Sequence, residues 1–171
     1  MKLIEFQNQM QIDRASNGTF AGARLADVTV QGLQRFQREN DIQNPIPPEK
    51  FHVTILYSRK PCPEYEPAGK YPAPIAADFL AWDLFPSQKD KDGNHSNCLV
   101  MKINSPELRA RHRYLMDKHG ATFDFDEYIP HLTLSYNAGD VLLEALPEFV
   151  EPIIITREYY QPIDLSWATN N

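Results

Sequence analysis

Two short segments constrain this chain more than any other feature of its sequence. Residues 51–57 read FHVTILY and residues 130–136 read PHLTLSY, so each places a histidine and a threonine two positions apart among apolar residues. Their β-branched and aromatic content predicts a strand in both places. Because side chains alternate faces along a strand, His52 and Thr54 should share one face, with the intervening apolar residues and Tyr57 on the other.

The same alternation groups His131, Thr133 and Ser135 on one face of the second predicted strand. Each strand would then pack its apolar row on a core and turn its imidazole and hydroxyl groups toward a cleft. If the two halves of the chain are related by pseudo-symmetry, the two polar pairs face each other.

Two imidazoles facing one site suit phosphodiester cleavage by general acid and general base. Histidine titrates near neutrality, so a neutral ring can take a proton from an attacking hydroxyl while a protonated ring gives one to the leaving oxygen. Thr54 and Thr133 can donate to the non-bridging oxygens, and this chemistry requires no metal or other cofactor. A lone histidine on a strand is more often structural, but two copies in matching contexts favour catalysis.

The remaining titratable residues near these strands receive ordinary roles. We expect surface or cap roles for His95, His112 and His119. Asp124, Asp126 and Glu127 precede the second motif without a recognisable ligand spacing, so we interpret them as solvated acids.

Periodicity and turn signals divide the rest of the chain into strands and helices. Strands are expected within Met1–Gln11, in Phe51–Tyr57, Phe79–Phe85, Cys98–Ile103, Ile129–Tyr136 and Ile153–Tyr160, the third and fourth forming a hairpin with a turn at Asp92–Gly93. A turn is expected at Ser16 to Gly18. Helices are expected over Arg24–Glu39 and from the Ser105 cap and Pro106 to Gly120. The five prolines between Pro61 and Pro74 predict an irregular covering loop rather than a central strand.

Size and composition fit one soluble globular domain spanning residues 1–171. The 171 residues are 42% hydrophobic, which supports one core, and the order of elements indicates two related halves in a single α+β domain. The net charge of −6 offers no basic surplus for long polyanions but allows a compact anionic ligand. Two cysteines, Cys62 and Cys98, suggest reduced thiols, and without an apolar segment for export or membrane insertion we expect a cytoplasmic protein and no membrane partner.

The paired segments His52-Val53-Thr54 and His131-Leu132-Thr133 resemble the two signature motifs of the 2H phosphoesterase superfamily. This resemblance implies a bilobal, pseudo-twofold α+β fold with antiparallel-rich sheets and helices packed on the outer side. It also implies metal-free catalysis by the two histidines on nucleotide or RNA phosphodiesters. The motif pair identifies the superfamily and leaves the substrate open.

A narrower resemblance is to the phage anti-CBASS phosphodiesterases, which degrade the cyclic oligonucleotide messengers of bacterial immunity. It rests on the short chain, a glycine-flanked aromatic residue before the first helix, and a C-terminal glutamate and tryptophan. It implies substrate-binding roles for Phe20, Glu158 and Trp167, although that family typically has tyrosine at the first position. An aromatic ring can stack on a base. The alternatives are core packing for Phe20, a solvent-facing strand position for Glu158 and an ordered tail for Trp167.

We therefore expect an enzyme that opens 3′,5′ bonds of small cyclic oligonucleotides, in the host cytoplasm if a phage encodes it. One alternative is an RNA-end processor acting on 2′,3′-cyclic phosphates or 2′,5′ links, and another is a sponge that binds cyclic nucleotides without turnover. Candidate local cations near strand ends are Lys50, Arg59, Lys102 and Arg157. The sequence leaves open ring size, base preference, product end, oligomeric state and which histidine is the acid.

Overall fold

A computed structural model describes residues 17–87, 89 and 91–163 of the chain. The strand expected within Met1–Gln11 and the predicted base platform Trp167 lie outside these residues.

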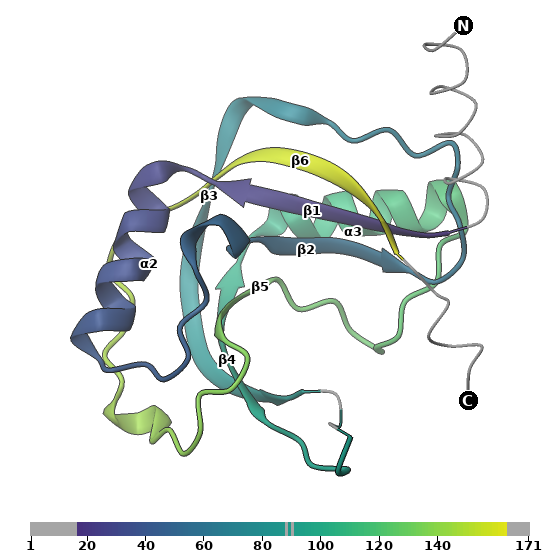
Figure 1. The fold of residues 1–171 in the computed structure, drawn as a ribbon. Helices are drawn as coiled ribbons and strands as arrows, with labels where there is room; N and C mark the ends of the chain where they lie inside the picture. The colour runs from purple at the N-terminus through teal and green to yellow at the C-terminus, as the bar shows by residue number, and fades with distance from the viewer. Residues whose placement is uncertain (1–16, 88, 90, 164–171) are drawn as a thin grey trace, which may run out of the picture.

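Strands close into an antiparallel barrel in the described part of the chain (Figure 1). The strands are β1 (Gly18–Leu25), β2 (Val53–Ser58), β3 (Gly69–Pro86), β4 (Asn97–Asn104), β5 (His131–Ser135) and β6 (Ile153–Ile163). Their order around the barrel is β1-β2-β5-β4-β3-β6. The helices are α2 (Asp27–Glu39) and α3 (Pro106–His119), with short 3₁₀ turns η1 (Pro48–Lys50) and η2 (Leu143–Ala145).

The barrel consists of two three-stranded lobes with matching connections. In one lobe β6, β1 and β2 are neighbours and α2 links β1 to β2; in the other β3, β4 and β5 are neighbours and α3 links β4 to β5. The lobes join where β2 pairs with β5 and where β3 pairs with β6. This confirms the predicted pseudo-twofold α+β architecture with antiparallel pairing.

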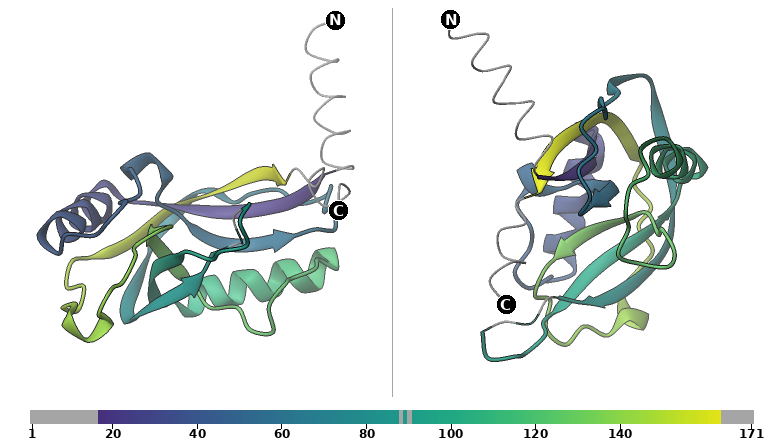
Figure 2. Two further views of the ribbon diagram at one scale, coloured as in Figure 1. Left: turned by 60° about the horizontal axis from the view of Figure 1, so that its bottom comes forward. Right: turned by 90° about the vertical axis from the view of Figure 1, so that its right-hand side faces the viewer.

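Each helix contacts strands of the other lobe and so links the two lobes. Figure 2 shows α2 at one end of the barrel and α3 running along its side. From α2, Phe36 stacks on Trp82 of β3 with ring centroids 4.5 Å apart, and Gln37 donates to the carbonyl of Leu134 in β5 at 3.0 Å. From α3, His112 bonds the carbonyl of Ile55 in β2 at 2.6 Å. Neither helix is long and apolar enough to span a membrane, and the same holds for every helix in the described residues.

Local signals define both ends of α3, as the sequence predicts. The Ser105 hydroxyl accepts from the Leu108 amide at 3.2 Å, Pro106 occupies the first turn, and Gly120 ends the helix in the left-handed conformation at φ +56°. The β3–β4 hairpin also confirms its prediction, with Gly93 at φ +81° in its turn.

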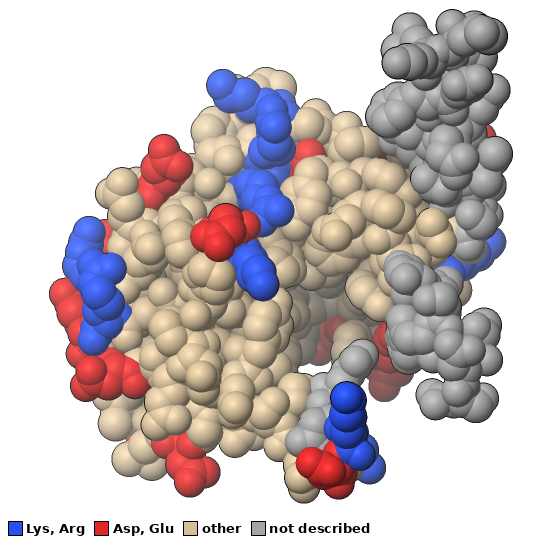
Figure 3. Space-filling model, in the orientation of Figure 1, with Lys and Arg blue, Asp and Glu red and all other residues tan. Residues whose placement is uncertain are grey.

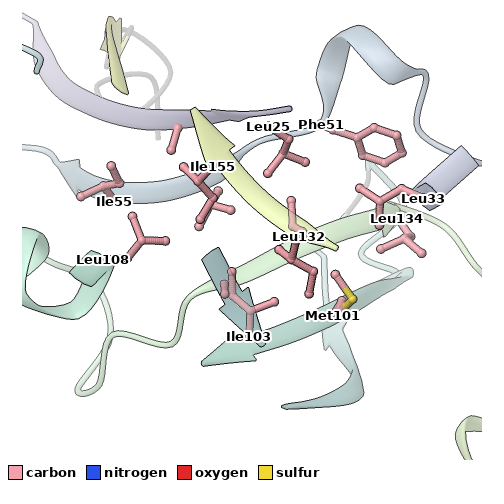
Figure 4. Close-up of a cluster of buried hydrophobic side chains, with 14 of the residues drawn as sticks. Leu25, Leu33, Phe51, Ile55, Met101, Ile103, Leu108, Leu132, Leu134 and Ile155 are labelled. Carbon is pink, nitrogen blue, oxygen red and sulfur yellow. The ribbon is translucent and has the colours of Figure 1, made fainter. Parts of the chain in front are cut away.

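A continuous apolar core fills the space between the lobes (Figure 4). Leu132 of β5 lies near its centre among side chains from both lobes, with Ile155 from β6 and Met101 from β4. All three are 0% exposed. The apolar rows of the two motif strands therefore share one core, so their polar rows must leave it on the other side.

The predicted helix over Arg24–Glu39 is wrong at its start. Residues 18–25, expected to begin with a turn, form strand β1, and the helix begins only at Asp27. β1 has partners on both edges, β2 and β6, and buries Ala21, Ala23 and Leu25 in period two. Pairing with two strands distant in sequence overrides the local helical spacing.

The proline-rich segment is also more ordered than predicted, because β3 begins at Gly69 and pairs with β6 from its first residue. The register then shifts between Lys70 and Ile75, the interval that holds Pro72 and Pro74. Prolines are accommodated at such an irregularity because no ladder hydrogen bond is required from them.

His112 of α3 is buried, so the predicted surface or cap role is wrong for this residue. Its burial also allows the packing of α3 to be tested through the pH dependence of stability. It stacks on Tyr128 with centroids 4.1 Å apart, and burial lowers its pKa below 6.5. The unfolded chain therefore binds more protons, so the free energy of unfolding should fall as pH drops below about 6.5. We predict a shallower fall, by up to about 1.4 kcal/mol per pH unit, for His112→Gln in urea unfolding between pH 7 and 5. Identical slopes would contradict this role.

Candidate active site

The single register pair between β2 and β5 brings the two motifs together. Val53 lies opposite Leu132, the middle residue of the other motif, and both are 0% exposed. In an antiparallel pair His52 then faces Thr133, and Thr54 faces His131. Directly opposed side chains have Cβ atoms about 5 Å apart. The four predicted catalytic side chains therefore form one cluster on the face away from the core.

Each imidazole is held by the same bond, to the backbone carbonyl two residues before it. His52 Nδ1 lies 2.9 Å from the Lys50 carbonyl, and His131 Nδ1 lies 2.7 Å from the Ile129 carbonyl. A carbonyl only accepts, so in each ring Nδ1 carries the hydrogen and Nε2 is left for proton transfer. The repetition of this contact in both lobes gives two imidazoles with the same reactive nitrogen.

The surroundings of the rings favour neutral imidazoles in the free protein. Burial lowers the pKa of both His52 and His131 below 6.5, against a smaller raising effect of the carbonyl bonds. The positive charge of Arg24 lowers the pKa of His52 further, and that of His52 lowers the pKa of His131. The two imidazoles thus interact electrostatically and resist being protonated together.

An aromatic ring stands edge-on to each histidine. Phe20 of β1 lies 5.7 Å from His52 and Phe85 of β3 lies 5.1 Å from His131, measured between ring centroids. Both phenylalanines are half-buried. The sequence predicts a strand at Phe85 but gives no sign of which face it takes, so this residue was missed.

The absence of a side chain at Gly22 lets the rings of Phe20 and Tyr159 lie close to each other. Its register partners are Thr54 on β2 and Tyr159 on β6, and a Cβ at this position would lie 2.6 Å from the Tyr159 ring and 2.7 Å from Phe20. Only glycine lets the two rings, 5.9 Å apart, approach above Thr54.

Register shifts just beyond each motif alter two of the predicted faces. Between β1 and β2 the shift leaves Ile55 as an extra residue, so Tyr57 lies opposite Phe20 on the histidine side rather than in the core row. Between β4 and β5 a shift turns Ser135 inward, where it is 0% exposed and donates to the Gln43 carbonyl at 2.7 Å. Strict alternation fails in both places because a bulge adds one residue.

Glu158 does not join the cluster, in contrast to its predicted substrate contact. It lies opposite Ala23, so it points to the face away from His52, and it is 1% exposed. Its carboxylate accepts from Tyr65 (2.7 Å), Tyr71 (3.1 Å), Arg111 (2.8 and 3.0 Å) and the Ala68 amide (3.2 Å). Burial alone would raise its pKa, but the bonds from Arg111 and Tyr65 outweigh it and lower the pKa. Glu158 therefore anchors α3 and the proline-rich segment.

The candidate cations divide according to their partners. Arg59 is exposed and forms an ion pair with Asp124, an exposed acid as predicted. Lys50 and Arg157 are exposed as well. Lys102 lies opposite His131 and pairs with Asp83 at 3.1 Å. The structure adds Arg24, which sequence reasoning had placed in a helix and which lies beside His52.

Comparison with known proteins identifies close relatives. The family described as "Anti-CBASS protein Acb1" matches residues 17–170. The protein of that name from Enterobacteria phage T4 is 35% identical over 159 residues, covering 93% of this chain and 97% of the relative. The one from Vibrio phage KVP40 is 36% identical over 159 residues, covering 91% and 94%.

Solved structures of Escherichia coli LigT share the fold. The apo form superimposes with a TM-score of 0.51 at 15% identity, covering 86% of this chain and 95% of that one. The complex with 3′-AMP gives the same TM-score at 14% identity and the same coverage. The 2H phosphoesterase fold expected from the two motifs is thereby confirmed.

The carbonyl bonds predict the tautomer of both active-site histidines. Above their pKa values, His52 and His131 should carry the hydrogen on Nδ1, and both should titrate below pH 6.5. Long-range ¹H–¹⁵N NMR of the imidazoles would show it, with His52→Ala and His131→Ala for assignment. Hydrogen on Nε2 in the neutral form of either ring would contradict the site geometry.

Proposed function

Because this chain belongs to the anti-CBASS Acb1 family, we propose that it is a metal-independent phosphodiesterase that opens 3′,5′ bonds of small cyclic oligonucleotide messengers in the host cytoplasm. The observation that carries the proposal is the convergence of two His–Thr pairs at one seam, each imidazole with Nε2 available. Opening the messenger would remove the signal that activates CBASS immunity.

The proposed reaction uses the two imidazoles as base and acid. One takes the proton of a ribose 2′-hydroxyl, the 2′ oxygen attacks the adjacent phosphorus, and the bond from phosphorus to the 5′ oxygen breaks. The other imidazole gives its proton to that 5′ oxygen, leaving a 2′,3′-cyclic phosphate end. Water can open the cyclic phosphate by the reverse use of the same groups. In this proposal Thr54 and Thr133 donate to the non-bridging oxygens as their charge grows.

Surface charge supports a compact substrate over long nucleic acid. The net charge is −6, and the face in Figure 3 shows basic side chains interspersed with acidic ones and broad uncharged areas. Long polyanions are held by many cations acting together. A small ring needs only the few donors beside the scissile phosphate.

The rings beside the histidines supply places for two bases. Phe20 and Phe85 lie on opposite sides of the cluster, one in each lobe, and each contacts the histidine of its own side. We assign them as stacking platforms for the nucleosides flanking the scissile phosphate. Trp167 stays a proposed third platform outside the described residues, whereas the buried position of Glu158 leaves its proposed substrate contact without support.

Substrate comparison in the presence of EDTA tests the proposal. We predict that the wild-type protein cleaves a cyclic trinucleotide under these conditions and that His52→Ala and His131→Ala each abolish turnover while remaining folded by circular dichroism. Release of intact ligand on denaturation would instead support the sponge. Cleavage restricted to linear 2′,5′ links or 2′,3′-cyclic RNA ends would support the RNA-end processor.

Loss of either phenylalanine ring should weaken binding. In a His52→Ala background that prevents turnover, Phe20→Ala and Phe85→Ala should each cost about 1 to 3 kcal/mol, a rise in Kd of roughly 5- to 150-fold. Calorimetry with a cyclic trinucleotide would measure it, with Phe125→Ala as control because that ring is 73% exposed in the segment before β5. An unchanged Kd would remove the variant residue from the binding site.

A further inference from the structure

The pseudo-twofold relation between the lobes places a cation opposite each histidine. On β1 the residue after Ala23, the partner of Val53, is Arg24, which therefore faces His52. On β4 the partner of His131 is Lys102. Directly opposed residues in an antiparallel pair share a face, so both cations lie on the histidine side of their sheets.

The two cations differ in the side chain that each of them contacts. Asp83 pairs with Lys102 at 3.1 Å and occupies the register position opposite Val100, which faces Thr133. The matching position in the other lobe, opposite the Gly22 that faces Thr54, is Tyr159. Arg24 therefore stacks on the ring of Tyr159, 4.4 Å from its centroid. At the equivalent position of the other lobe, Lys102 instead contacts the carboxylate of Asp83. Within the described residues no carboxylate forms an ion pair with Arg24.

Arg24 is also fixed in place by the backbone that leads into His52. Its Nη1 donates to the carbonyls of Glu49 (3.1 Å) and Phe51 (3.2 Å). The carbonyl between them, that of Lys50, accepts the Nδ1 hydrogen of His52. The guanidinium therefore fixes the backbone that positions the imidazole, and it also places a positive charge beside that ring.

We propose that Arg24 is a positioning residue that keeps His52 neutral, so that His52 takes the proton of the 2′-hydroxyl and His131 gives its proton to the departing 5′ oxygen. This inference rests on the proposed phosphodiesterase activity and adds the direction of proton transfer. A charge beside one of two like groups decides which of them holds the shared proton.

The other charges around the two rings are consistent with this direction. His52 is faced by Arg24 from β1 and has His131 as its diagonal neighbour on β5. The side chain of Lys50 is exposed, and so is that of Arg157, which lies opposite Arg24 on β6. His131 is faced by Lys102, whose charge Asp83 compensates, and has His52 as its diagonal neighbour. Burial lowers the pKa of both rings, and the repulsion between the two imidazoles is mutual, so neither effect separates them. The permanent charge of Arg24, which forms no ion pair with a carboxylate of the described residues, is what distinguishes His52 from His131.

A substrate with sulfur in place of the bridging 5′ oxygen at one linkage separates acid from base. A thiolate leaves without being protonated, so this substrate removes the need for the general acid, which contributes roughly 10²- to 10⁴-fold. We expect His131→Ala to regain a factor of that size on the sulfur substrate relative to the oxygen one, and His52→Ala to stay inactive on both. Rescue of His52→Ala, of both variants or of neither would overturn the assignment. Wild-type protein that cleaves no cyclic oligonucleotide would instead refute the proposed function.

The role of Arg24 has its own readout in the pH profile of kcat/KM. Arg24→Gln should move the acidic limb, which reports the base, to higher pH, whereas Arg24→Lys should keep that limb near its wild-type position. Arg38→Gln, which removes an exposed arginine from α2, is the matched control. Lower activity with an unmoved acidic limb would reduce Arg24 to a structural residue, and a moved alkaline limb would reverse the roles of the histidines.

Discussion

The pairing of Val53 with Leu132 is the contact on which the site depends. Both side chains are buried in the core shared by the lobes, and β2 and β5 have this one register pair. A slip of one residue would exchange the faces of a whole strand, turning a histidine inward and apolar side chains out. Burial of the apolar rows is therefore what holds four polar side chains together on the opposite surface.

That seam is short, so contacts elsewhere must keep the lobes in register. The crossed packing of α2 and α3 does this from outside the barrel, through Phe36 on Trp82 and His112 on the Ile55 carbonyl. Glu158 adds a buried polar anchor, since it joins β6 to Arg111 of α3. A buried carboxylate is tolerated there because Arg111, two tyrosines and a backbone amide donate to its oxygens.

The pseudo-twofold arrangement explains how one strand design yields both an acid and a base. Duplication of the His–Thr motif gives two imidazoles with the same tautomer and the same bond to the backbone. Identical surroundings would leave no preferred direction for the proton. The differences lie in neighbouring strands, where a ring below Arg24 replaces the carboxylate that meets Lys102. The direction of proton transfer in this site then depends on residues of β1, β6, β4 and β3, outside the two motif strands.

By itself the sequence determined the features that depend on near neighbours along the chain. The His-x-Thr strands, the caps of α3 at Ser105 and Gly120, and the turn at Gly93 follow from side-chain alternation and backbone preference. Only the tertiary structure decided the strand at residues 18–25, the faces of Tyr57 and Ser135, and the places of Phe85, Arg24 and Glu158. These depend on bulges and on register between strands far apart in the chain, which no local pattern specifies.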